Sequence, residues 1–309
     1  MTSIVTETRQ RMGKVGVFGS GVGSLAGISA DGERRHAEAV ERLGYGSLWI
    51  GEAIGGKDVF VRQAVSLAVT SRLVTGTGIA NVWSRHARTS HAAAATLADA
   101  YPGRFVLGLG IGNPLQAKAV GADYRPLRQL REYLDRMDAP LQDEGRAEVP
   151  SPAAPYARIL GAVGPKMLAL SAERADGAQP FVQPVEHTAA ARKILGPDKL
   201  LIQPLAVLLA DDRAEGMATA TVLFERVREV PAYARSWRQL GFSQDAIDTS
   251  DPRLVEAIIA VGDADTIAAK VREHLDAGAD HVPVLPIVPT PEEAVTQLEK
   301  LAPTLLGAL

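Results

Sequence analysis

Short apolar runs alternate with amphipathic stretches along most of the chain. The runs are largely uninterrupted by polar residues, which is typical of strands buried on both faces of a parallel sheet. Helix-compatible sequence follows the runs, and Gly44 after the first helical stretch is a typical helix end. Strands are predicted at 15–20, 46–52, 73–79, 104–111, 157–163, 176–182, 199–210 and 281–288. Helices are predicted at about 31–43, 58–70, 88–100, 126–137, 164–175, 187–196 and 263–278, with further helical sequence in 211–260 and after Pro291.

This pattern contains eight strand–helix repeats. A strand followed each time by a helix is typical of an α/β protein with a parallel sheet. Eight repeats over about 290 residues favour a closed (β/α)₈ TIM barrel over an open doubly wound sheet. No long linker divides the chain, so we expect a flexible N-terminal segment at 1–14 and a single barrel domain at 15–309.

Composition narrows the function classes. The chain has 309 residues, a formal net charge of −3 and no cysteine, which excludes disulfides and thiolate chemistry. The near-balanced charge argues against a nucleic-acid partner, because phosphate binding needs an excess of Lys and Arg. Neither a signal-peptide core nor an apolar run of roughly 18 residues is found, so we expect no membrane partner and a cytoplasmic location.

In such a barrel the active site lies at the C-terminal ends of the strands. Glu52 directly follows the second strand, where it is either an acid/base group or a solvated or helix-capping carboxylate. Gly76 and Gly78 in the third strand permit close approach of a ligand or of neighbouring backbone. Asn81 and Trp83 then lie over the barrel mouth.

Other strand ends carry further candidates. The glycines of GLGIGNP (108–114) leave room for a flat ring system, or alternatively form a tight turn. In GAVGPKM (161–167), Pro165 suits the first position of a helix whose free amides bind anions; an ordinary strand–helix turn is the alternative. GSGVGS (19–24) does not fit a dinucleotide fingerprint. Arg85 and His86 are more often solvated, and structural roles are expected for His274 and His281.

The ordered set of segments resembles the bacterial luciferase-like superfamily of flavin and deazaflavin enzymes. The resemblance rests on ERLGYGSLWIGEA, TSRLVTGTGIANV, PGRFVLGLGIGN, GAVGPKM, ADGAQPF, EHTAAARKILGPD and VREHLDAGADHV, and it covers about residues 15 to 290. The chain is most similar to the branch that uses coenzyme F420, which includes methylenetetrahydromethanopterin reductase-like enzymes. The resemblance implies a (β/α)₈ barrel, usually homodimeric.

The resemblance also implies roles for individual residues. A cis peptide bond that supports the deazaflavin ring falls at Gly78–Ile79, with Asn81 beside the ring. Gly110 and Gly112 line the same cofactor site, and the phosphate-binding turn falls on Ala162, Val163, Gly164 and Pro165. The family's polar acid/base positions fall on Glu52 and Asn113. We expect Trp83 and Gln179 to contact the substrate. The chain departs from its relatives at Asn113, which cannot exchange protons as a carboxylate does, and at Gln179, where relatives tend to have histidine.

The leading hypothesis is therefore hydride transfer between F420 and a small organic substrate. An FMN-dependent monooxygenase on the same fold is the alternative. A catalytically silent barrel that retains cofactor binding is a third possibility. A sugar-phosphate lyase or isomerase is a fourth, but it would require a Lys or paired carboxylates at strand ends.

Overall fold

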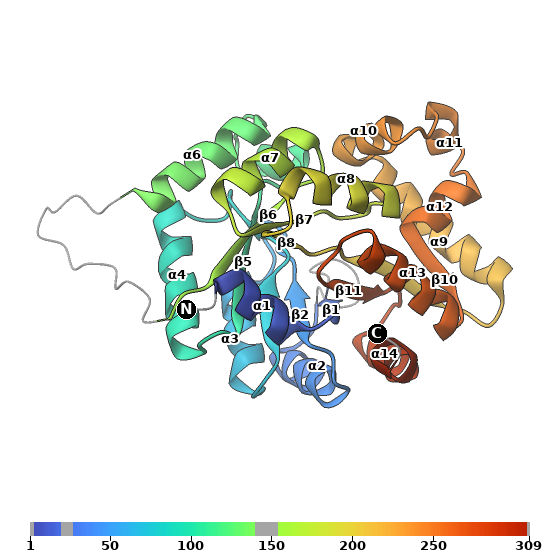
Figure 1. Cartoon of the computed structure of the whole chain (residues 1–309), viewed down its shortest axis with the longest axis horizontal. Coiled ribbons are helices and arrows are strands. Elements are labelled where there is room, and N and C mark those ends of the chain that lie inside the picture. The colour runs from blue at the N-terminus through green and yellow to red at the C-terminus, as the bar shows by residue number, and fades with distance from the viewer. Residues whose placement is uncertain (1–2, 20–26, 140–153, 308–309) are drawn as a thin grey trace, which may run out of the picture.

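The computed structural model describes residues 3–19, 27–139 and 154–307. The strands run through the middle of the molecule and the helices surround them (Figure 1). The strands are β1 (Val15–Gly19), β2 (Ser47–Ile50), β3 (Val74–Thr77), β4 (Ala80–Asn81), β5 (Phe105–Gly110), β6 (Ala157–Gly161), β7 (Gly177–Gln179), β8 (Leu200–Leu201), β9 (Leu205–Leu209), β10 (Ile259–Gly262) and β11 (Val282–Pro286).

The helices alternate with these strands over most of the chain. They are α1 (Ile4–Met12), α2 (Ala30–Arg42), α3 (Val59–Ala68), α4 (Ala87–Ala100), α5 (Pro114–Ala119), α6 (Pro126–Asp138), α7 (Pro165–Arg174), α8 (Val185–Leu195), α9 (Arg213–Arg228), α10 (Pro231–Gln239), α11 (Gln244–Asp248), α12 (Pro252–Ile258), α13 (Ala264–Asp276) and α14 (Pro291–Gly307).

The strands form the predicted (β/α)₈ barrel. All pairings are parallel, in the order β10-β9-β11-β1-β2-β3-β5-β6-β7-β8, and β4 also pairs with β5. The seventh barrel strand is divided at Gln203 and Pro204 into β8, which pairs with β7, and β9, which pairs with β11. A parallel bridge from Ile202 to His281 closes the ring.

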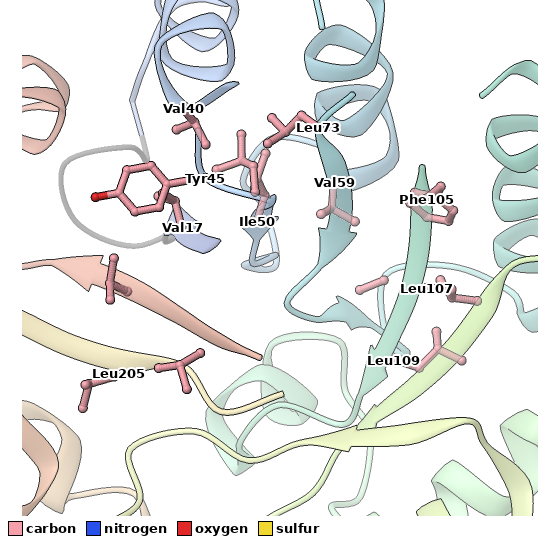
Figure 2. Packing of buried hydrophobic residues seen from close by; sticks show 14 of the residues in the cluster. Val17, Val40, Tyr45, Ile50, Val59, Leu73, Phe105, Leu107, Leu109 and Leu205 are labelled. Carbon is pink, nitrogen blue, oxygen red and sulfur yellow. The ribbon is translucent and has the colours of Figure 1, made fainter. Parts of the chain in front are cut away.

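Alternation along the strands divides the core into two layers. Phe105, Leu107 and Leu109 of β5 point outward into the layer beneath the helices, which Figure 2 shows at close range. Val106, between them in sequence, belongs instead to the barrel interior, together with Trp49. Because successive strand residues point to opposite faces, one strand supplies both layers. This explains why the strands appear as continuous apolar runs in the sequence.

The prediction of a flexible segment at 1–14 is wrong for residues 4–12, which form helix α1. Ser3 caps this helix by accepting a hydrogen bond from the Thr6 amide at 3.2 Å. Val5 and Met12 belong to the barrel-interior cluster, and Arg9 binds Asp280 at 2.8 Å. The segment is polar overall, but Val5 and Met12 lie on one face of the helix, and burial of that face holds it in place.

A second difference concerns the predicted helical stretch 211–260. It forms four helices, α9 to α12, and then the strand β10, which pairs with β9. The four residues IAVG are too few for periodicity to separate a strand from the end of a helix. Helices α9 to α12 pack around Phe224 and Trp237 as a cluster of their own.

Within the residues that the structure describes, no helix is both long and apolar enough to cross a membrane. Most of the glycine-rich segment 19–24 after β1 lies outside the described residues.

Candidate functional site

The predicted site residues all lie at, or directly after, the C-terminal ends of strands β2 to β7. Parallel strands bring these ends to one side of the barrel, so residues from distant parts of the sequence meet there. Among the described residues no group of three or more His, Cys, Asp or Glu side chains could hold a metal ion. The arrangement consists of three connected parts: an ion pair, the glycine-rich floor of the barrel mouth around the bond from Gly78 to Ile79, and a helix N-terminus.

Glu52 is the carboxylate of the ion pair, and all its hydrogen-bond partners are donors. Arg85 donates to both of its oxygens, and the Asn81 amide donates to Oε2 at 2.7 Å. The Glu52 side chain is only 3% exposed. Burial by itself would lower the pKa of Arg85, but Glu52 and Asp58 outweigh it and raise that pKa above its ordinary value. Glu52 therefore binds the Arg85 side chain and the backbone amide of Asn81, the last residue of β4.

Asn81 and Trp83 continue this network across the barrel mouth. The Asn81 side chain accepts a hydrogen bond from the Trp83 amide at 3.0 Å and donates to Gln116 Oε1 at 3.1 Å. The Trp83 indole donates to the Ile111 carbonyl at 2.8 Å. These bonds connect the ends of β4 and β5 through side chains. Nothing in the sequence indicated that Gln116 belongs to the site, because helix α5 is too short to be recognised from its residue pattern.

Asn113 has a structural function in this geometry. It is the N-cap of α5: its side-chain oxygen accepts from the amides of Leu115 and Gln116, and Gln116 accepts from the Asn113 amide in return. Such a reciprocal capping box satisfies backbone donors at a helix start. The residue predicted as catalytic therefore has its side-chain oxygen engaged in the cap.

The peptide bond between Gly78 and Ile79 is cis, as the family resemblance implied. The Ile79 side chain lies directly against two glycines of neighbouring strands. A Cβ at Gly110 would lie 2.5 Å from Ile79 Cγ1, and one at Gly161 would lie 3.3 Å from Ile79 Cγ2. The space predicted beside Gly110 for a ligand ring is thus filled by Ile79, so Gly110 shapes the floor of the barrel mouth indirectly.

Gly112 also makes room for protein atoms. It has a φ of +59°, and an added Cβ would collide with Gln116 Oε1. Its left-handed conformation lets the chain turn from β5 into α5. Like Gly110, it therefore supports the site without offering open space of its own.

Gln179 carries an unused donor beside this floor. An added Cβ at Gly78 would lie 2.6 Å from Phe18 Cε2 and 3.1 Å from Gln179 Oε1, so these side chains adjoin the cis bond. Gln179 is 4% exposed, and its Nε2 has no hydrogen-bond partner among the described residues. A buried donor without a partner costs free energy unless a ligand or water satisfies it. Gln179 is therefore available to bind a ligand.

The third part is the start of α7, formed by the segment Ala162 to Pro165. Gly164 is the N-cap residue, Pro165 follows at the first helical position, and no side chain caps this end. A Cβ added to Gly164 would meet no described atom within 4 Å. The His187 ring nitrogen Nε2 donates to the Val163 carbonyl at 2.7 Å. Burial lowers the pKa of His187, although this hydrogen bond opposes the shift.

These parts are joined through neighbouring strands. The Ala162 amide donates to the Gln179 carbonyl at 3.4 Å, and Gly161 of β6 lies in register with Gln179 of β7. Arg85, expected to be solvated, is instead the largely buried partner of Glu52, with its side chain 11% exposed. Phe18, Gly161 and His187 also contribute, although none had been singled out for the site. Their partners lie on other strands or helices, so local sequence gave no signal for them.

Comparison with known proteins identifies the family. Residues 11–281 match the family model described as luciferase-like monooxygenase. Among curated proteins, the 5,10-methylenetetrahydromethanopterin reductase of Methanolobus tindarius is 28% identical over 182 residues, which are 53% of this chain. The match spans 56% of the length of that reductase.

Solved structures share the fold. The coenzyme F420-dependent tetrahydromethanopterin reductase of Methanopyrus kandleri superposes with a TM-score of 0.71 at 17% identity, over 96% of this chain and 99% of the reductase. The oxygenating constituent of 3,6-diketocamphane monooxygenase from a Pseudomonas putida plasmid, in complex with FMN, gives 0.70 at 15% identity, over 94% and 98%. Since the family model matches most of the chain, the chain belongs to the luciferase-like family of oxidoreductases.

Proposed function

We propose that this chain is a coenzyme F420-dependent oxidoreductase that transfers a hydride between the deazaflavin and a small organic substrate. One observation carries the proposal. The uncapped start of α7 and the unpartnered amide of Gln179 lie on adjacent strand ends, so an anion-binding turn is next to a buried donor. A cofactor that combines a phosphate with a planar, hydrogen-bonding ring matches this pair of features.

The residues present fit such a group. Free amides at a helix start bind phosphate, and the space beside Gly164 is open. The turn formed by Ala162, Val163, Gly164 and Pro165 would hold the phosphate through the amides at the start of α7. Ala162 and Pro165 would shape this turn, because the Ala162 amide already donates to Gln179 and Pro165 has no amide hydrogen. Gly78 and Ile79 would contact the ring, with Asn81 at its edge. Gly110 and Gly112 would act indirectly, because they shape the backbone and the Ile79 contact.

The bound cofactor supplies the hydride chemistry, and the protein supplies orientation and a dry pocket. Gln179 Nε2 would donate a hydrogen bond to the ring or to the substrate, and as an amide its donor does not titrate. The Glu52–Arg85 pair holds the Asn81 amide and hence the loop that ends in Trp83. Trp83 would form one wall for the substrate. We propose that solvent, rather than Glu52 or Asn113, supplies the proton.

Absorbance-monitored titration with F420 and with FMN tests this assignment. We expect the purified chain to bind F420 more tightly than FMN. Tight FMN binding without F420 binding would contradict the proposal and favour a flavin monooxygenase, an activity named for one of the structural neighbours. Oxygen consumption with reduced FMN would then measure that activity. Binding of F420 without oxidation or reduction of any candidate substrate would instead favour a silent barrel.

We further propose that the chain forms a homodimer in the cytoplasm, as the family resemblance implies. Sedimentation velocity on the purified chain measures the oligomeric state directly. The expected mass is twice that of one chain. A species of single-chain mass at micromolar concentration would contradict the dimer without affecting the cofactor assignment.

A further inference from the structure

We propose that His187 is a positioning residue for the phosphate turn: its ring sets the direction of the peptide unit that presents the Gly164 amide to the anion. The inference rests on the proposed function, because it concerns how the same turn recognises a phosphate. His187 itself would touch no cofactor atom and would act through the backbone.

The hydrogen bond between His187 and Val163 defines the orientation of that peptide unit. Val163 contributes a carbonyl oxygen, which only accepts, so His187 Nε2 carries the proton in this 2.7 Å bond. The peptide bond from Val163 to Gly164 is trans. In a trans peptide the carbonyl and the amide N–H point in opposite directions. Holding the Val163 oxygen toward α8 therefore turns the Gly164 N–H away from α8.

The space on the Cβ side of Gly164 is open. No described atom lies within 4 Å of a Cβ built on Gly164, and no side chain caps this end of α7. Pro165 has no amide hydrogen, and the amides of Met167 and Leu168 both bond to the Gly164 carbonyl. Among the amides from Gly164 to Leu168, those of Gly164 and Lys166 are therefore left for an anion, and His187 orients the first of them.

The His187 ring is committed to this one bond. It is 4% exposed, and its Nδ1 has no partner among the described residues. The next residue, Thr188, bonds to His274 of α13 at 2.9 Å, which fixes the first turn of α8 against a second helix. His187 thus reaches the turn from an anchored helix, as a positioning residue requires.

The test compares affinities for F420 and for its deazaflavin riboside lacking the phosphate. In the wild-type chain the phosphate should strengthen binding. His187→Phe removes the donor while filling the ring volume, so the Gly164 amide is no longer held in direction. We expect the ratio of the two affinities to fall at least about tenfold, since a hydrogen bond to a charged group contributes that much. Affinity for the phosphate-free riboside should change by less than about threefold, because no ring contact is altered.

Two further variants separate positioning from a general structural role. His187→Gln places an amide donor near the position of Nε2 and should restore the ratio, whereas His187→Asn, with a shorter side chain, should not. His36→Phe replaces another buried histidine, on α2, and should leave the ratio unchanged. Circular dichroism checks that each variant is folded. If His187→Phe is not folded, the comparison of His187→Gln with His187→Asn tests the role of His187 in its place.

The outcomes distinguish a failure of the proposed phosphate site from a failure of the proposed role of His187. A wild-type ratio near one would show that the turn does not recognise phosphate, which overturns both the phosphate site and the role of His187. A high wild-type ratio that persists in His187→Phe, or in His187→Asn, would overturn the role of His187 and leave the proposed function intact.

Discussion

At the residue scale, glycines decide how the floor of the barrel mouth packs. Gly110 and Gly161 come from adjacent strands, and both accommodate the side chain of Ile79. Without a Cβ at these positions, Ile79 lies flat against two backbones directly after the cis bond. The two strands therefore carry glycine at these positions for packing between protein segments.

Gly110→Ala should disturb this floor. Its Cβ would lie 2.5 Å from Ile79 Cγ1, so Ile79 or a strand must move. We expect a loss of about 1–3 kcal/mol in the free energy of unfolding, the usual cost of overpacking. Urea denaturation measures this loss. Gly27→Ala is the matched control because its added Cβ meets no described atom within 4 Å; equal stabilities of the two variants would refute the packing role of Gly110.

The Glu52–Arg85 pair should behave as a coupled unit. Removal of one partner leaves the other buried, so Glu52→Gln and Arg85→Gln should each lower the free energy of unfolding by roughly 2–4 kcal/mol. The double variant should lose less than the sum, since both charges are then gone. Urea denaturation of all four proteins gives the coupling. The same cycle on the exposed pair Arg131 and Glu173 should give a coupling free energy of less than about 1 kcal/mol. A coupling free energy as small as this for Glu52 and Arg85 would contradict the structural role of that pair.

At the element scale, helix α1 closes the N-terminal end of the barrel. Met12 is fully buried among interior residues such as Trp49, and Arg9 reaches Asp280 directly before His281 and β11. The barrel strands cannot fill this end by themselves, because the interior side chains there need a covering layer. A segment of polar composition is thus part of the core.

Met12→Ala should reveal this contribution. Truncation of a fully buried methionine typically costs about 2–5 kcal/mol, because it combines lost burial with a cavity. Thermal or urea unfolding measures the loss. Leu115→Ala serves as the control because Leu115 is 76% exposed and should change stability by less than about 0.5 kcal/mol. A Met12 variant as stable as the Leu115 variant would show that α1 is not packed in solution.

At the scale of the whole molecule, buried histidines couple stability to pH. Burial lowers the pKa of His36 and of His281 to about 4 and that of His274 to about 3. His281 donates from Nδ1 to the Gly13 carbonyl and accepts from Ser47 at Nε2, a pattern that requires the neutral ring. The fold therefore depends on three uncharged imidazoles.

The sign of the pH dependence follows from linkage. An unfolded histidine has its ordinary pKa of about 6.5, so between that pH and about 4 the unfolded chain binds more protons than the native one. The free energy of unfolding should fall as pH decreases through this window, by up to about 1.4 kcal/mol per pH unit for each histidine. Urea denaturation between pH 6.5 and pH 5 measures the slope. His36→Phe should remove the contribution of one histidine to this slope. An unchanged slope in that variant would contradict the lowered pKa assigned to His36.

The sequence predicted where the candidate residues lie better than it predicted which partners they contact. Glu52, Asn81, Trp83 and Gln179 all lie at the mouth, because their positions follow from the strand repeat. Their partners did not follow from it. Glu52 meets Arg85 across 33 residues, and His187 meets Val163 across 24, and such contacts depend on how the helices and loops pack.

The repeat of apolar runs and helical stretches, by itself, determined the barrel and the edge that carries the site, because period and repeat number are local properties of the chain. The resemblance of GTGIAN to its family placed the cis bond. Only the tertiary structure showed that Gly110 makes room for Ile79, that Asn113 caps a helix, that residues 4–12 close the barrel and that His187 donates a hydrogen bond to the Val163 carbonyl. Apart from the helix cap, each of these features is a contact between segments that are distant in the sequence. Such contacts form only when the segments pack together and bury their surfaces against one another.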